Sequence, residues 1–137
     1  MQKLFLLILF SYQISVCAEA KEWTLMHIDN NQTSFYINLG DFLLKKNKTR
    51  MWVMENFRTI QEVKHLKYLS TKSLVQFDCN LNIIRILAYS LYEDQFASGN
   101  SIYKRSEALK WDKISPHSVN KAYQDIACQE AIPDKNQ

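Results

Sequence analysis

Glycine and proline are scarce in this 137-residue chain, with two of each. A phosphate-binding loop needs several closely spaced glycines, because backbone N–H groups must approach the phosphate closely. The only glycines, Gly40 and Gly99, lie far apart. This excludes a P-loop and a glycine-rich dinucleotide-binding fingerprint. No internal repeat and no low-complexity segment is present either.

Histidine is also rare, and its positions suit no known catalytic or metal pattern. None of the three, His27, His65 and His117, belongs to a His-Glu-x-x-His motif, and no Cys/His spacing suits zinc. His27 falls in a strand pattern and is interpreted as packed or hydrogen-bonded, the other two as solvated. We therefore expect a non-enzymatic protein with no catalytic residue, no metal and no cofactor. A Ser-His-Asp set assembled in space stays open, since such triads leave no sequence spacing.

A large excess of one sign of charge is absent as well. Lys and Arg number 17 against 14 Asp and Glu, which gives a formal net charge of +3. That bias is too weak to predict a nucleic-acid partner.

The N-terminus has the layout of a cleaved secretory signal. Lys3 supplies the positive charge, Leu4–Phe10 is a short apolar run, and small residues allow cleavage after Ala18 or Ala20. We expect residues 1–20 to be a signal peptide, 21–130 one folded domain, and 131–137 a flexible C-terminal tail. No later segment approaches the run of about 18 apolar residues typical of a membrane span. The predicted location is the periplasm, the outer-membrane surface or the medium.

Cysteine usage agrees with export. Cys17 either leaves with the signal or is lipidated, and only lipidation would attach the chain to a membrane. Cys79 and Cys128 then remain, and an even count in an oxidising compartment predicts one disulfide, with two free buried thiols as the alternative. The bond would close a loop of 49 residues. The loop-entropy relation values such a closure at about 4 kcal/mol.

Strand patterns cover most of the mature chain. The stretch Tyr68–Tyr92 is rich in β-branched and aromatic residues and is typical of two long strands, with Cys79 at the turn between them. The second of these strands, Leu81–Tyr92, is apolar on both faces, so we expect it at the centre of the sheet. Arg58–Lys67 is interpreted as a long connection with room for one helical turn. The segment at 41–44 suits either a helical turn or a strand. Further strands are predicted at Glu22–Asp29, Thr33–Asn38, Met51–Phe57 and, as a short edge strand, Ser101–Lys104.

A helix is predicted near the C-terminus, with Ser115 as N-cap and Pro116 in the first helical position. One apolar stripe runs along it, formed by Val119, Ala122, Tyr123 and Ile126. Cys128 falls off this stripe. Either the helix ends near Ala127, or Cys128 reaches Cys79 from the helix flank. Strands followed by one helix predict an α+β domain: a mainly antiparallel β-sheet with the C-terminal helix packed on one face and stapled by the disulfide.

Basic residues gather in two places and are the candidate ligand-binding residues. The first set is Lys45, Lys46, Lys48 and Arg50, and the second, looser set is Lys64, Lys67 and Lys72 with Arg58. Basic loops engage acidic glycans, lipopolysaccharide phosphates or acidic protein surfaces. The alternative is a solvated turn with lysines that protect sheet edges.

Asp78 and Arg85 flank the turn at Cys79 and suit a cross-strand ion pair, or two separately solvated side chains if the register differs.

The chain resembles the surface-adhesin protein E-like family of Gram-negative bacteria. The most specific part is Trp111-x-x-Ile114-x-Pro116-x-Ser118, followed by Ile126-Ala-Cys128. Other matching pieces are Phe35-Tyr36, Met51-Trp52-Val53-Met54, Ser70-x-Lys72, Phe77-Asp78-Cys79, Arg85-Ile86-Leu87, Tyr89-Ser90 and Gly99.

This resemblance implies an exported domain with the same sheet, helix and Cys79–Cys128 disulfide, and a non-enzymatic role. The family is named for an adhesin that binds host extracellular-matrix and plasma proteins and can self-associate. We therefore expect an adhesin-like binding protein with host matrix or plasma proteins or acidic glycans as partners, and a homodimer as one assembly. The alternative is a structural, accessory or inhibitor-like protein of the periplasm.

Overall fold

The computed structural model describes residues 23–38, 43–130 and 132–133. The predicted signal peptide, Cys17 and most of the predicted tail lie outside the described residues. Among the residues that are described, no helix is long and apolar enough to cross a membrane.

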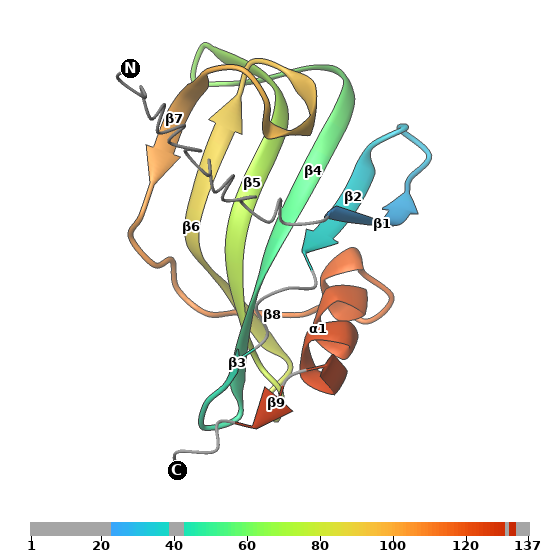
Figure 1. Cartoon of the computed structure of the whole chain (residues 1–137), viewed down its shortest axis with the longest axis vertical. Helices are drawn as coiled ribbons and strands as arrows, with labels where there is room; N and C mark the ends of the chain where they lie inside the picture. The colour runs from blue at the N-terminus through green and yellow to red at the C-terminus, as the bar shows by residue number, and fades with distance from the viewer. Residues whose placement is uncertain (1–22, 39–42, 131, 134–137) are drawn as a thin grey trace, which may run out of the picture.

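A strongly curved antiparallel sheet forms the body of the molecule (Figure 1). Its strands follow the order β1-β2-β4-β5-β6-β7, and β8 pairs with the free side of β6. Their bounds are β1 Trp23–Ile28, β2 Ser34–Asn38, β4 Lys48–Val63, β5 Leu66–Asp78, β6 Ile83–Tyr92, β7 Ser101–Arg105 and β8 Asp112–Lys113. The helices are the short 3-10 turn η1, Gln95–Ala97, and α1, Val119–Glu130. The α+β prediction is thus confirmed.

A second, two-stranded sheet joins β3, Leu43–Leu44, to β9, Ile132–Pro133, in parallel. This settles the ambiguous segment at 41–44 as a strand for its last two residues. It also places Ile132 and Pro133, which fall in the predicted tail, in a paired strand.

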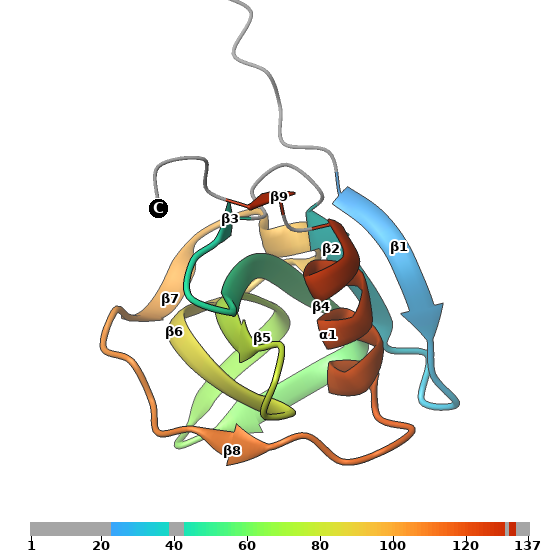
Figure 2. The ribbon, with the colours of Figure 1, turned by 90° about the horizontal axis from the view of Figure 1, so that it is seen from below.

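The core lies between the sheet and α1. Viewed along the strands, the sheet curves around the helix (Figure 2). Phe77 and Ala127 are fully buried, and Tyr123 is 2% exposed. The other core members come from β2, β4, β5, β6 and the segment before α1, so the helix packs against the concave face of the sheet. Burial of such side chains is the main stabilising term of the fold.

The disulfide joins Cys79, in the β5–β6 turn, to Cys128 in the last turn of α1, with 5.8 Å between the Cα atoms. The predicted pairing is confirmed. The helix continues to Glu130, so Cys128 reaches its partner from the helix flank. Gln124, one turn earlier on the same flank, donates from Nε2 to the carbonyl of Asp78 at 3.0 Å. Two adjacent helical turns therefore attach α1 to the turn between β5 and β6, which we call the elbow.

Three details of the predicted helix are wrong. It begins at Val119, and Ser118 is the capping residue, since its Oγ accepts a hydrogen bond from the Lys121 amide at 3.2 Å. His117 has a φ of 61°, which interrupts any helix starting at Pro116. Ala122, predicted in the buried stripe, is exposed. The buried face is rotated toward Tyr123 and Ala127, which brings Cys128 closer to the sheet than the predicted stripe would.

The interpretation of Arg58–Lys67 as a connection is also wrong. β4 runs on to Val63, turns through Lys64 and His65, and returns as β5 from Leu66. Both turn residues have positive φ, 46° and 67°. Such a two-residue turn normally carries Asn or Gly, so this hairpin leaves little sequence signal.

The Tyr68–Tyr92 hairpin is confirmed, but its second strand is not the centre of the sheet. β4 and β5 are central, and β6 lies next to the edge strands β7 and β8. β6 is apolar on both faces although only its two ends have strand partners on that side, at Ile83–Ile84 and Tyr89–Tyr92.

Candidate ligand-binding surfaces

The first basic set lies on a tight turn that leads into β4. Lys45 and Lys48 exchange two backbone hydrogen bonds, at 2.9 and 3.0 Å. Lys46 and Asn47 occupy the loop with φ of 48° and 60°. The segment is therefore a two-residue hairpin turn, which pairs Lys45 with Lys48.

These residues line one open hollow of about 390 Å³. We call it the basic hollow. Its lining is Lys45, Lys46, Lys48, Thr49, Arg50 and Gln76. All four residues of the first set thus meet at one place.

The positive charge of the basic hollow is mostly unbalanced. Lys48 forms an ion pair with Asp78 at 3.5 Å. Within the described part of the chain, Lys45, Lys46 and Arg50 form no ion pair, and all three are exposed. Exposed cations without acidic neighbours create a positive potential that attracts anions.

The basic surface continues across the strands. Gln76 lies between Arg50 and Arg85 in the strand register. Its Oε1 accepts hydrogen bonds from Arg85 Nε at 2.8 Å and from the terminal Nη2 at 2.6 Å. The Arg85 guanidinium lies 4.5 Å above the ring of Trp111. The Trp111 ring on its face and the Gln76 hydrogen bonds at its edge make this guanidinium less mobile than that of a free arginine. Such a fixed planar cation suits recognition of a planar or bidentate anion.

The predicted alternatives for Asp78 and Arg85 are both wrong. Asp78 lies opposite Ile83, two residues from Arg85. Its Oδ1 accepts the amides of Asn80 at 3.0 Å and Leu81 at 3.2 Å, so the carboxylate holds the turn and binds Lys48 instead.

The second basic set is dispersed. Lys64 lies at the tip of the β4–β5 hairpin, and Lys67 is exposed opposite Glu62. Lys72 is half-buried, with its ammonium nitrogen 4.8 Å from the ring centre of Trp52 and 5.9 Å from that of Trp23. Cation–π contacts of this kind hold Lys72 against the sheet face opposite α1. The structure brings together the first set and not the second.

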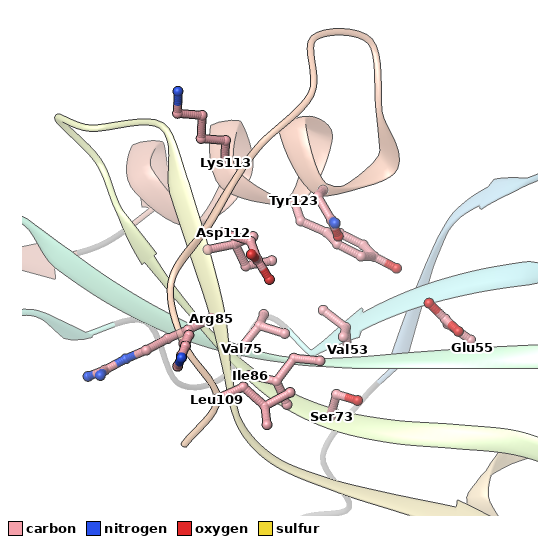
Figure 3. Close-up of a pocket in the computed structure, with 13 residues that line it drawn as sticks. Val53, Glu55, Ser73, Val75, Arg85, Ile86, Leu109, Asp112, Lys113 and Tyr123 are labelled. Carbon is pink, nitrogen blue, oxygen red and sulfur yellow. The ribbon is translucent and has the colours of Figure 1, made fainter. Parts of the chain in front are cut away.

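A second hollow, of about 260 Å³, lies between the sheet, β8 and α1 (Figure 3). We call it the helix-side hollow. Its floor is aliphatic, and its polar lining includes Glu55, Ser73, Asp112, Asn120 and Tyr123. Sequence reasoning missed it, because its residues come from β4, β5, β6, β8 and α1. The one available signal was Glu55, a carboxylate directly after the apolar run Met51–Met54.

Two groups of the helix-side hollow have altered acidity. Burial raises the pKa of the Glu55 carboxyl, the charge of Asp29 raises it further, and a hydrogen bond with Thr71 opposes the rise. Burial also raises the pKa of the Tyr123 phenol well above its ordinary value, with a smaller contribution from the Glu55 charge. In both groups burial is the main cause, because removal from water disfavours the charged form.

The sequence model of the Surface-adhesin protein E family matches residues 23–129. The chain belongs to this family. The match spans the sheet, α1 and both cysteines of the disulfide, so the family resemblance found in the sequence is confirmed. No functionally curated protein matches the chain significantly in sequence.

Solved structures of Haemophilus influenzae protein E share the fold. Crystal form II of that protein superposes with a TM-score of 0.61 at 11% identity, covering 78% of this chain and 87% of that one. Its selenomethionine form gives a TM-score of 0.59 at 12% identity, with 78% and 85% covered. At such identity the similarity establishes the fold alone. The family is one of surface adhesins, and this implies that the protein is exported.

Proposed function

We propose that the protein is an exported, non-enzymatic adhesin that binds acidic glycans, or acidic patches of host matrix or plasma proteins, through the basic hollow. The observation that carries this proposal is the convergence of four cationic side chains on one open hollow. Three of them have no acidic partner among the described residues. Arg85, fixed on Trp111 and Gln76, extends the same positive surface.

Heparin is the probe that tests the proposal, because it presents sulfates and carboxylates without a host protein attached. Binding of the purified, oxidised protein should be saturable at physiological salt and should weaken linearly on a log–log plot as salt increases. The critical variant replaces Lys45, Lys46 and Arg50 by Ala. All three are exposed, so the fold should be retained. Loss of three anion contacts should weaken binding by more than about tenfold and lower the salt slope by about three.

A charge-matched control separates this hollow from general positive charge. Lys64, Lys67 and Lys104 are also exposed and lie on other parts of the sheet. Their replacement by Ala removes the same formal charge and should change affinity by less than about twofold. Equal losses in both triple variants would assign binding to net charge, and absence of saturable binding would refute the proposal.

Display on the cell surface is the second part of the proposal. Protease treatment of whole cells should degrade the protein if it is displayed. Protection in whole cells, with release by osmotic shock, would support a periplasmic accessory protein instead.

A further inference from the structure

The helix-side hollow contains a buried hydroxyl that no described residue satisfies. Tyr123 is 2% exposed, and its Oη has no hydrogen-bond partner. A buried polar group without a partner costs free energy, so such a group points to a ligand or to water. The phenol is directed toward the end of the hollow where Glu55 lies (Figure 3).

Five charged side chains line the hollow: Glu55, Arg85, Lys110, Asp112 and Lys113. The carboxylates of Glu55 and Asp112 point toward the space between them, whereas the guanidinium of Arg85 and the ammonium of Lys113 point away (Figure 3). Arg85 is held by Gln76 and Trp111. Neither Glu55 nor Asp112 forms an ion pair within the described residues. Two carboxylates without an ion pair thus face the interior of the hollow, where they can bind a cation.

The floor between the two carboxylates is hydrocarbon. It is formed by Val53, Val75, Ile86 and Leu109. At about 260 Å³, the hollow is small, so it suits a short chain and excludes a folded partner. A ligand that fits must carry positive charge at its ends and methylene groups between them.

We propose that the helix-side hollow binds primary aliphatic amines. One ammonium group lies at Glu55 and the Tyr123 hydroxyl, the methylene chain lies on the aliphatic floor, and a second ammonium, where present, lies at Asp112. The ammonium donates hydrogen bonds to the carboxylate and to the phenol oxygen, which supplies the partner that Tyr123 lacks. A free diamine and the side chain of a lysine in a partner protein share this chemistry. The site is separate from the basic hollow and does not depend on the proposed function.

Calorimetric titration of the purified, oxidised protein tests the ligand class. The probes are 1,5-diaminopentane, 1-aminopentane, pentan-1-ol and pentanoate, which share one chain length and differ in charge. Binding should be strongest for the diamine, weaker for the monoamine, and absent for the alcohol and the anion. Saturation by pentanoate, or no saturation by either amine below about 10 mM, overturns the proposal. The latter result means that the hollow holds only water.

Two substitutions assign the ends of the ligand. Glu55→Gln should weaken both amines by about tenfold or more, since a charge-assisted hydrogen bond is lost. Asp112→Asn should remove the advantage of the diamine and leave the monoamine unchanged. Asp112 is exposed, so this variant should fold normally. Glu62→Gln, an exposed carboxylate at the far tip of β4, is the matched control and should change neither affinity.

Tyr123→Phe separates ligand binding from stability. Because the hydroxyl has no protein partner, its removal should leave the melting temperature unchanged or raised, and should weaken amine binding by about threefold to tenfold. Amide shifts in NMR should map to Ser73 and Asn120, which line the hollow. Unchanged amine affinity in both Glu55→Gln and Tyr123→Phe overturns the proposed site.

A lysine derivative identifies the source of the amine. Nα-acetyl-lysine methylamide presents the same side chain as a lysine in a polypeptide. Binding of this compound in preference to 1,5-diaminopentane assigns the hollow to a partner's lysine, and the reverse order assigns it to free diamines.

Discussion

Removal of the Cys79–Cys128 disulfide should lower stability by an amount set mainly by the unfolded chain. The bond joins residues 49 positions apart. Closing a loop of this length removes about 14 cal/mol/K of chain entropy from the unfolded state, or about 4 kcal/mol at 25 °C. One kcal/mol shifts the melting temperature of a domain of this size by about 3–6 °C, so the loss should approach about 15 °C.

The folded contacts around the bond should persist without it. Gln124 still donates to the Asp78 carbonyl, and the Cys79 amide still donates to the carbonyl of Asn47 at 2.8 Å. Tyr123 and Ala127 keep α1 packed in the core. The double variant Cys79→Ser, Cys128→Ser should therefore keep the native circular dichroism spectrum at 20 °C, with its loss appearing in the melting temperature.

Thermal melts monitored by circular dichroism test this reasoning. Four samples are needed: the oxidised protein, the same protein with reductant, the double serine variant, and that variant with reductant. The last three should melt together, well below the first. A double variant within about 3 °C of the oxidised protein would refute the entropic account, since less than about 1 kcal/mol would then depend on the crosslink.

The other predictions concern single positions. Phe77→Ala should cost about 3–5 kcal/mol in urea melts, because the fully buried ring leaves a cavity. Gly99→Ala should cost about 1–2 kcal/mol, since φ is +68° and the new Cβ would meet the carboxylate of Asp94. Glu55→Gln should raise the melting temperature at pH 7. The folded pKa of Glu55 is raised above 4.5 by burial and by Asp29, so wild type loses stability as pH rises through that raised pKa. The difference should vanish below the unfolded value near pH 4.5, and a constant difference from pH 3 to 8 would contradict it.

Local sequence patterns predicted the strands and the helix that are stabilised by contacts between sequence neighbours or by strongly apolar faces. The hairpin around Cys79 was predictable because both strands are rich in β-branched and aromatic residues. Its register was not predictable, because the bulge between Leu74 and Val75 shifts one strand against the other. The same limitation concealed that Arg85 faces Gln76.

The tip of the β4–β5 hairpin shows where pattern reasoning fails. Residues 58–63 are mostly exposed and alternate poorly, so no buried face marks them as a strand. These residues form a strand because their backbone pairs with β5. The pairing resumes after an interruption between Asn56 and Gln61. A turn of Lys64 and His65 offers no glycine or asparagine as a marker.

The two hollows differ in predictability for a related reason. The cationic residues of the basic hollow are neighbours in sequence, so a charge count located them. Those of the helix-side hollow meet only after α1 and β8 close over the sheet, and no spacing links Glu55 to Asp112 or Tyr123. A charge count also could not show that Lys72 lies against two tryptophans, because these come from different strands.

The disulfide and the basic hollow share one piece of backbone, yet they depend on different contacts. The amide of Cys79 donates to the carbonyl of Asn47, inside the turn that presents the lysines. The ion pair between Lys48 and Asp78 also joins β4 to β5, and it does not involve α1. The geometry of the hollow therefore follows from strand pairing and from the Asp78 turn, whereas the crosslink limits how far α1 and the elbow can separate in the unfolded chain. Stability and ligand binding are thus separable at this elbow, and a loss of binding in a folded disulfide variant would have to arise from movement of the Asn47–Cys79 contact.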